Sequence, residues 1–179
     1  MKNFDWYKIK FLESPSNLKN LIKEKIGKSP SSRIAYQIAI HVQHGRQFFE
    51  TAASSPLDIR PLQLFYGILN FSKALVIAKT IQPLETLNQS HGVKDISSQN
   101  IKLENATVKI EKKGTFQNFN DQVCILNRVC YFDKVYMPTS VTLPTSNAKS
   151  LLNINLTLRD ILSRIPKIED LYKDTFNKC

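Results

Sequence analysis

The chain has 179 residues, of which 42% are hydrophobic and 22% are charged, a balance typical of a globular protein with a single core. Its net charge of +10 makes nucleic-acid binding a hypothesis, but the Lys and Arg residues are spread thinly instead of forming a basic block. The three cysteines lack zinc-ligand spacing and the first residues lack the apolar segment of a signal peptide, so we expect a cytoplasmic protein without a metal or another cofactor.

The first half of the chain is predicted to be helical after a short arm. Residues 1–13 should form an arm or strand anchored by scattered bulky apolar residues. Ser14 and Pro15 open a first helix that should end near Gly27, because Ser caps a helix start and Gly stops a helix. Apolar residues spaced by three and four predict a long second helix from about Ser32 to Ala53.

A third helix is predicted over residues 61–80, with Pro61 in its first turn, where a missing N–H costs little. Apolar residues cover most of its circumference, and we therefore expect it to be the buried central helix of the fold, with Leu69 in the core. Polar and Lys residues interrupt its most apolar part, which argues against a membrane span.

One narrow polar stripe, formed by Tyr66, Asn70 and Lys73, runs along this third helix. The stripe could bind an anion, because Lys supplies charge and Asn and Tyr supply directional hydrogen bonds. We favour the alternative that it is a paired polar seam that fixes the helix register. In that case Lys73 should be paired within the stripe or with Glu85 or Asp95, since a buried unpaired ammonium would lose its proton.

The hydrophobic period changes to that of strands after a polar loop over residues 82–100. Alternating apolar residues and a Lys-Lys-Gly turn predict a small β-hairpin near 106–117. Residues 124–136 fit a short helix or a strand equally well, and residues 138–146 are typical of a loop.

The end of the chain is predicted to be helical again. Thr157, with Asp160 three residues later, predicts the capped start of a helix that runs to Arg164. Pro166 separates this helix from a last turn or helix. The elements together predict a mainly α fold, a helical bundle with a small β-hairpin packed against it, in one domain over residues 1–179.

Four residues are candidates for catalysis. Arg33, His41 and His44 lie on the polar side of the second predicted helix, where Arg could hold a scissile phosphate and His could act as a general acid or base of a metal-independent ribonuclease. We favour the alternative that His41 is hydrogen-bonded at a helix contact and His44 is a surface residue. His91 precedes Gly92 at the end of a loop, where it is either a reactive imidazole or part of a turn.

A second set of candidates would bind nucleic acid. The first thirty residues contain seven Lys and three acidic residues, and Lys19, Lys23 and Lys25 fall on the first predicted helix. If these side chains contact phosphates, binding should be weak, independent of sequence and strongly reduced by salt.

The common enzyme motifs are absent from the sequence. Gly occurs five times and never in the spacing of a phosphate-binding loop, and we find no nucleophile elbow, no H-E-x-x-H and no D-x-D motif. Our first hypothesis is therefore a non-catalytic binding or assembly module that acts through a protein partner or as a homo-oligomer, without a membrane and with non-specific nucleic-acid binding at most.

Five segments carry a resemblance to the YaaC-like proteins, a bacterial family without an established activity. They are QHGRQFFETA at 43–52, IRPLQLFYGILNFSKAL at 59–75, HGVKD at 91–95, KGTFQNF at 113–119 and LRDILSRIPKIEDLY at 158–172. Members of this family generally continue beyond the length of this chain. The resemblance thus implies a short variant of the family or the N-terminal part of its longer architecture.

More distantly, the segment FYGILNFSKALVIA, followed by a loop and His-Gly, resembles the middle helices of HEPN-type proteins, helical bundles found in ribonuclease toxins and phage-defence systems. Their catalytic signature is Arg, four to six residues, then His. In this chain seven residues separate Arg33 from His41, which turns the histidine about 80° away from the arginine on a helix. The resemblance supports the bundle and leaves a HEPN-like metal-independent ribonuclease, in phage defence or a toxin system, as the second hypothesis.

Overall fold

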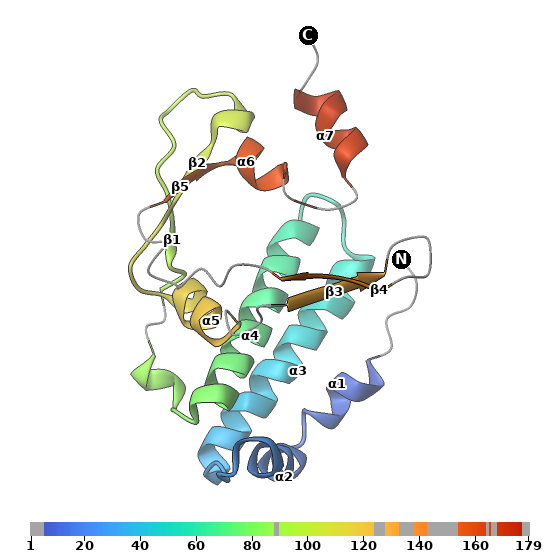
Figure 1. Ribbon diagram of the computed structural model, residues 1–179, viewed down its shortest axis with the longest axis vertical. Helices are drawn as coiled ribbons and strands as arrows, with labels where there is room; N and C mark the ends of the chain where they lie inside the picture. The colour runs from blue at the N-terminus through green and yellow to red at the C-terminus, as the bar shows by residue number, and fades with distance from the viewer. Residues whose placement is uncertain are drawn as a thin grey trace. The chain divides into compact units, whose positions relative to one another are not determined.

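The computed structural model of the protein describes residues 6–87, 90–123, 128–132, 138–142, 154–163, 165 and 168–176, with the backbone alone at 128–132 and 138–142. These residues divide into two compact units. The helical unit contains the described residues up to 87 together with 118–123. The mixed unit contains residues 90–117 and the described residues after 123 (Figure 1).

Helices build the first unit. Its described residues up to 87 form α1 (Tyr7–Phe11), α2 (Pro15–Ile26), α3 (Ser32–Ser54), α4 (Arg60–Thr80) and the 3-10 turn η1 (Leu84–Thr86). The predicted helix boundaries are confirmed to within a few residues, because the capping residues act locally. The Oγ of Ser14 accepts the N–H of Asn17 at 3.4 Å, and the Oγ of Ser31 accepts the N–H of Ile34 at 3.3 Å.

Residues 7–11 are a short helix, so the expectation of a strand there is wrong for the described part of the arm. Scattered apolar residues in a short segment do not distinguish the two structures. Ile9 and Leu12 both pack against the core of the helical unit, and their spacing of three residues is that of one helix face.

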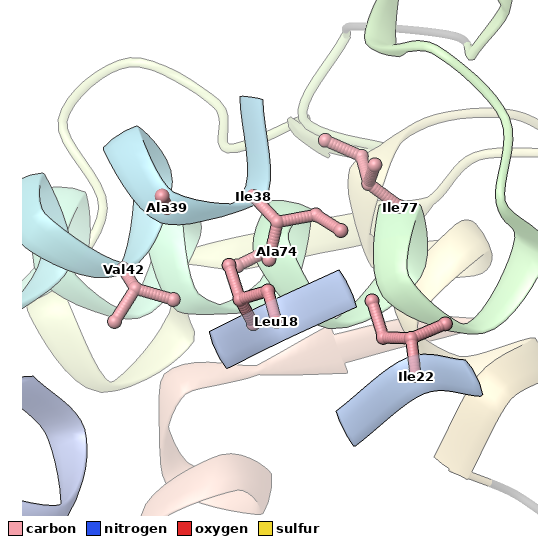
Figure 2. Packing of buried hydrophobic residues seen from close by; sticks show 7 residues of the cluster. All are labelled: Leu18, Ile22, Ile38, Ala39, Val42, Ala74 and Ile77. Carbon is pink, nitrogen blue, oxygen red and sulfur yellow. The ribbon is translucent and has the colours of Figure 1, made fainter. Parts of the chain in front are cut away.

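The core of the helical unit lies where α2, α3 and α4 meet (Figure 2). Its buried side chains come from all three helices and are Leu18, Ile22, Ile38, Ala39, Val42, Ala74 and Ile77. Ile38 and Ile77 are almost completely excluded from solvent. The predicted apolar face of α3 is therefore confirmed, and α2 covers the contact between the two long helices.

Two glycines allow α3 and α4 to approach closely. A Cβ on Gly45 would lie 2.8 Å from the ring of Phe71, and a Cβ on Gly67 would lie 2.7 Å from the ring of Phe49. The two rings stack on each other at 5.7 Å, and Trp6 contacts both of them. Each long helix thus receives an aromatic ring of the other in a glycine notch, which fixes the α3/α4 register.

The expectation that α4 is buried all round is wrong for its first half. Leu62 is 57% exposed, Phe65 45% and Ile68 58%, whereas most of its buried residues lie in the second half. The apolar periodicity of a helix shows which face it could bury, but it does not show whether another element packs there. In the described structure no element covers this face of α4. Length and composition alone would let α4 cross a membrane, as they would the core helix of a soluble protein.

The mixed unit contains a three-stranded antiparallel sheet in the order β1-β2-β5, formed by β1 (Val93–Asp95), β2 (Thr107–Ile110) and β5 (Asn155–Thr157). Lys94 pairs with Lys109, and Val108 pairs with Leu156. The 3-10 turn η2 (Leu103–Asn105) precedes β2. The mainly α fold with a small β component is thus confirmed.

The predicted hairpin near 106–117 is right in its first strand and wrong in its second. Residues 115–123 form the helix α5 (Thr115–Val123), which runs from the mixed into the helical unit. The N–H of Thr115 donates to the carbonyl of Ser90 and that of Phe116 to the carbonyl of His91. These bonds cap α5, so the chain after β2 starts a helix instead of returning as a strand.

The remaining elements lie towards the C-terminus. They are the antiparallel pair β3 (Arg128–Phe132) and β4 (Pro138–Thr142), then α6 (Leu158–Leu162) and α7 (Glu169–Phe176). The ambiguous segment thus contains a strand, and the loop expected over 138–146 is a strand in its first five residues. The capping box of Thr157 and Asp160 is confirmed, while Arg164 and Pro166 lie outside the described residues.

Candidate functional site

The two polar stripes predicted on separate helices meet in the structure. His41 Nδ1 of α3 and Asn70 Oδ1 of α4 lie 2.8 Å apart, and Asn70 Nδ2 donates to the carbonyl of Tyr66 at 2.8 Å. Because the Asn70 oxygen accepts, Nδ1 of a neutral His41 carries the proton and Nε2 is its unprotonated nitrogen. We name His41, His44, Tyr66, Asn70 and Lys73 the polar seam.

Burial lowers the pKa of His41 below its usual value of 6.5. The hydrogen bond with Asn70 opposes this effect, and the nearby charges of Lys73 and His44 add to it. His41 is therefore neutral near pH 7. The favoured interpretation of His41 as a hydrogen-bonded residue at a helix contact agrees with this geometry.

The lowered pKa predicts how stability depends on pH. The unfolded chain binds more protons than the native chain just below pH 6.5, so the helical unit should lose stability as the pH falls through this range. His41→Asn, which keeps an N–H for Asn70, should flatten the loss. Melting followed by the fluorescence of Trp6, the single tryptophan, between about pH 7.5 and 5.5 would measure it.

The parent protein, melted over the same pH range, is the reference for this measurement. Equal slopes for the parent and His41→Asn would contradict the assignment of the effect to His41.

Lys73 is half-buried, and it makes no hydrogen bond or ion pair among the described residues. The expected partners are engaged elsewhere. Asn70 binds His41 and the Tyr66 carbonyl, Glu85 binds Arg33 and Gln37, and Asp95 accepts the N–H of Ser97. The internal pairing expected for Lys73 is therefore not found, and a cation is left within the seam.

Arg33 holds the segment after α4 and does not act next to His41. Its Nη2 donates to Glu85 Oε1 at 2.9 Å, and Gln37 Nε2 donates to the same oxygen at 2.9 Å. Hydrogen bonds from the backbone of Glu85 and from Arg33 and Gln37 lower the pKa of the Glu85 carboxyl. Arg33 lies eight residues from His41, which is about 12 Å along a helix, so the structure does not bring this pair together.

His91 belongs to the mixed unit, whereas His41 and His44 belong to the helical unit. Gly92 has a φ of 78°, and its backbone touches Gly114, where a Cβ would lie only 2.3 Å from the Gly92 Cα. The His-Gly peptide therefore forms the tight contact that caps α5. This geometry agrees with the turn interpretation of His91-Gly92.

The Lys candidates of α2 do not form a single basic face. Lys19 Nζ donates to the Oγ of Ser32 at 2.8 Å, and Lys25 pairs with Glu24 at 3.0 Å. Lys23 is exposed, and Lys25 points away from it because two residues turn a helix by about 200°. Lys19 and Lys23, four residues apart, share one face of α2, and phosphate binding by these lysines stays a prediction.

Two features of the helical unit were not anticipated from the sequence. The rings of Phe48 and Tyr66 stack at 5.6 Å beside the seam. Arg46 binds both carboxylate oxygens of Glu13 and also binds Glu50. Of these contacts, only the ion pair between Arg46 and Glu50 could have been predicted from the sequence, because the two residues are four positions apart on one helix.

Within the described residues, no group of three or more His, Cys, Asp or Glu side chains gathers where it could hold a metal ion. Cys124 and Cys179 lie outside these residues, and only the backbone of Cys130 is described. The polar seam is consequently the main concentration of chemically active side chains that the structure describes.

The comparisons with known proteins give a family and no closer relative. No curated protein and no solved structure matches the chain. The family model described as YaaC-like Protein matches residues 5–179, a range that includes all five segments that carry the resemblance. The protein therefore belongs to the YaaC-like family.

Proposed function

We propose that this protein is a non-catalytic assembly module of the bacterial cytoplasm that associates with a second copy of itself through α4. The supporting observation is the exposed apolar face at the start of α4, which we name the outer α4 patch. It consists of exposed large apolar side chains, namely Leu57, Ile59, Leu62, Phe65 and Ile68. Several exposed large apolar side chains within twelve residues of the chain are typical of a binding site.

The spacing within the patch supports a second copy as the partner. Leu62, Phe65 and Ile68 are three residues apart and therefore symmetric about Phe65. Two copies of α4 packed antiparallel about a twofold axis at Phe65 would place Leu62 of one copy against Ile68 of the other. A twofold contact needs one self-complementary surface, and this row of side chains provides it.

The charge distribution supports the same partner. Between Arg60 and Lys73, α4 carries no charged residue, so two copies can approach there without burying a charge. The net charge of +10 on each copy opposes association at long range, and salt screens this repulsion. Self-association should therefore strengthen as salt is added, whereas nucleic-acid binding would weaken.

Sedimentation velocity over a wide range of concentration and salt tests the proposal. We expect a monomer–dimer equilibrium in the parent that Phe65→Lys abolishes, because the change places two charges at the centre of the contact. Leu171→Lys, at an exposed apolar residue of the mixed unit, is the matched control and should still dimerise. A parent that stays monomeric at all concentrations, or equal association of both variants, would overturn the proposal.

The second candidate is a HEPN-like metal-independent ribonuclease. The neutral His41 beside Lys73 supports it, since such an imidazole can accept a proton at neutral pH. The engagement of Arg33 with Glu85 counts against it, because this arginine is not available to hold a phosphate beside the histidine. Cleavage of total RNA without added metal, lost in His41→Ala and His44→Ala, would favour this candidate over the assembly module.

A further inference from the structure

The polar seam holds the ammonium of Lys73 beside two imidazoles, and no carboxylate of the described residues pairs with that ammonium. His44 follows His41 by one turn of α3, Lys73 follows Asn70 by one turn of α4, and His41 and Asn70 are hydrogen-bonded. The charges that act on His41 are those of Lys73 and His44, and no acidic side chain of the described residues acts on it. Two histidines and a lysine thus share one region.

Four glutamates of the helical unit are engaged elsewhere. Glu13 and Glu50 bind Arg46, Glu85 binds Arg33, and Glu24 binds Lys25. The half-buried ammonium of Lys73, next to low-dielectric surface, attracts an anion. The missing counter-charge therefore points to an anionic ligand from outside the chain.

The seam also presents hydrogen-bonding groups that suit a phosphoryl group. Lys supplies up to three N–H donors, and a protonated histidine supplies N–H donors at both ring nitrogens. Asn70 already bonds His41 and the Tyr66 carbonyl, so it fixes the imidazole and leaves ligand contact to His44, Lys73 and Nε2 of His41. A phosphoryl dianion would favour protonation of the His41 imidazole.

An aromatic surface lies at one end of the seam. Tyr66 is partly exposed, and its ring is held by stacking on Phe48 at 5.6 Å and by an edge contact with Phe65 at 5.4 Å. A ring fixed on one side can stack a planar base on the other, and such stacking tolerates every base. Tyr66 thus adds a preference for a ligand with a planar ring.

We propose that the polar seam binds a mononucleotide, with the phosphoryl group at Lys73, His44 and His41 and the base over Tyr66. The phosphoryl contacts of this site lie outside the outer α4 patch, whereas Phe65 at the centre of that patch also contacts Tyr66 at 5.4 Å. Binding to Lys73 explains why a half-buried ammonium is kept where no carboxylate among the described residues pairs with it.

Isothermal titration of the parent with AMP, adenosine and inorganic phosphate tests the proposal. We expect AMP to bind, adenosine not to bind and phosphate to bind more weakly than AMP. Lys73→Met keeps the length of the side chain and removes its charge, and should weaken AMP binding at least about tenfold. Lys79→Met, at an exposed lysine of the same helix, is the matched control and should bind AMP like the parent.

Several outcomes would overturn the proposal. Absence of AMP binding to the parent, or equal binding by Lys73→Met and Lys79→Met, would remove the site. Phosphate binding as tight as that of AMP would remove the role of Tyr66. If Lys73→Met does not melt cooperatively, His44→Gln at an exposed position provides the same comparison, and AMP binding that His44→Gln leaves unchanged would contradict the seam as a phosphoryl site.

Discussion

Replacing Ile77 by Asp should unfold the helical unit, whereas the same change at Leu62 of the same helix should leave a cooperative melt. Ile77 is fully buried among side chains of α2 and α3 (Figure 2). The change forfeits about 2–5 kcal/mol of apolar packing and buries a carboxylate without a partner, which adds several kcal/mol. Domains have a total stability of only about 5–15 kcal/mol.

Trp6 provides the measurement, because its ring contacts Phe49 and Phe71 inside the helical unit. Urea unfolding followed by Trp6 fluorescence should show no native baseline for Ile77→Asp. Leu62→Asp should unfold within about 0.5 kcal/mol of the parent, as surface substitutions do. A midpoint for Ile77→Asp near that of the parent would show that this contact is not the core.

The second large effect is expected at Arg46, which ties the turn after α1 to α3. The side chains of Arg46 and Glu13 are 12% and 18% exposed, and hydrogen bonding to Glu13 raises the pKa of Arg46. Arg46→Met should cost about 3 kcal/mol, because the Glu13 carboxylate then remains in a mostly buried place without its partner. Met retains most of the apolar contact made by the arginine stem.

Two further variants make this prediction specific. Adding Glu13→Gln to Arg46→Met should recover part of the loss, since the uncompensated charge disappears. Arg33→Met breaks an exposed ion pair with Glu85 and should cost less than about 1 kcal/mol. Urea unfolding of the four proteins gives the comparison, and equal losses for Arg46→Met and Arg33→Met would contradict the buried character of the first pair.

The elements that could be predicted from the sequence are those that depend on near neighbours. The caps at Ser14, Ser31 and Thr157 act within three residues, and the apolar face of α3 follows from its own period. The strand β2 was identified by alternation, but its partners β1 and β5 lie far away in the chain. The alternation of apolar and polar residues identifies a strand, but it does not show which other strands pair with that strand.

The residues of the polar seam could be predicted from the sequence, but the contact between its two helices could not. His41 and Asn70 were both assigned to polar stripes, and each stripe follows from the geometry of one helix. Their hydrogen bond depends on the antiparallel register of α3 and α4, which the notches at Gly45 and Gly67 fix. The exposure of Leu62 was not predictable either, because whether an apolar helix face is buried depends on the elements that pack against it.

Cross-linking across the twofold axis tests the assembly proposal most directly. In a chain with Cys124, Cys130 and Cys179 replaced by Ser, one sample carries Leu62→Cys and a second carries Ile68→Cys. A twofold contact centred on Phe65 places these positions opposite each other. Two copies of position 62 would lie about 9 Å apart along the helices, beyond the Cα separation of about 4.4–6.8 Å that a disulfide spans.

The assembly proposal predicts that mild oxidation of the two samples mixed together gives a disulfide-linked dimer, and that each sample alone gives far less. Phe65→Lys, introduced into both samples, should remove the cross-link. Equal cross-linking in the mixed and separate samples, or none in the mixture, would contradict a twofold association through α4.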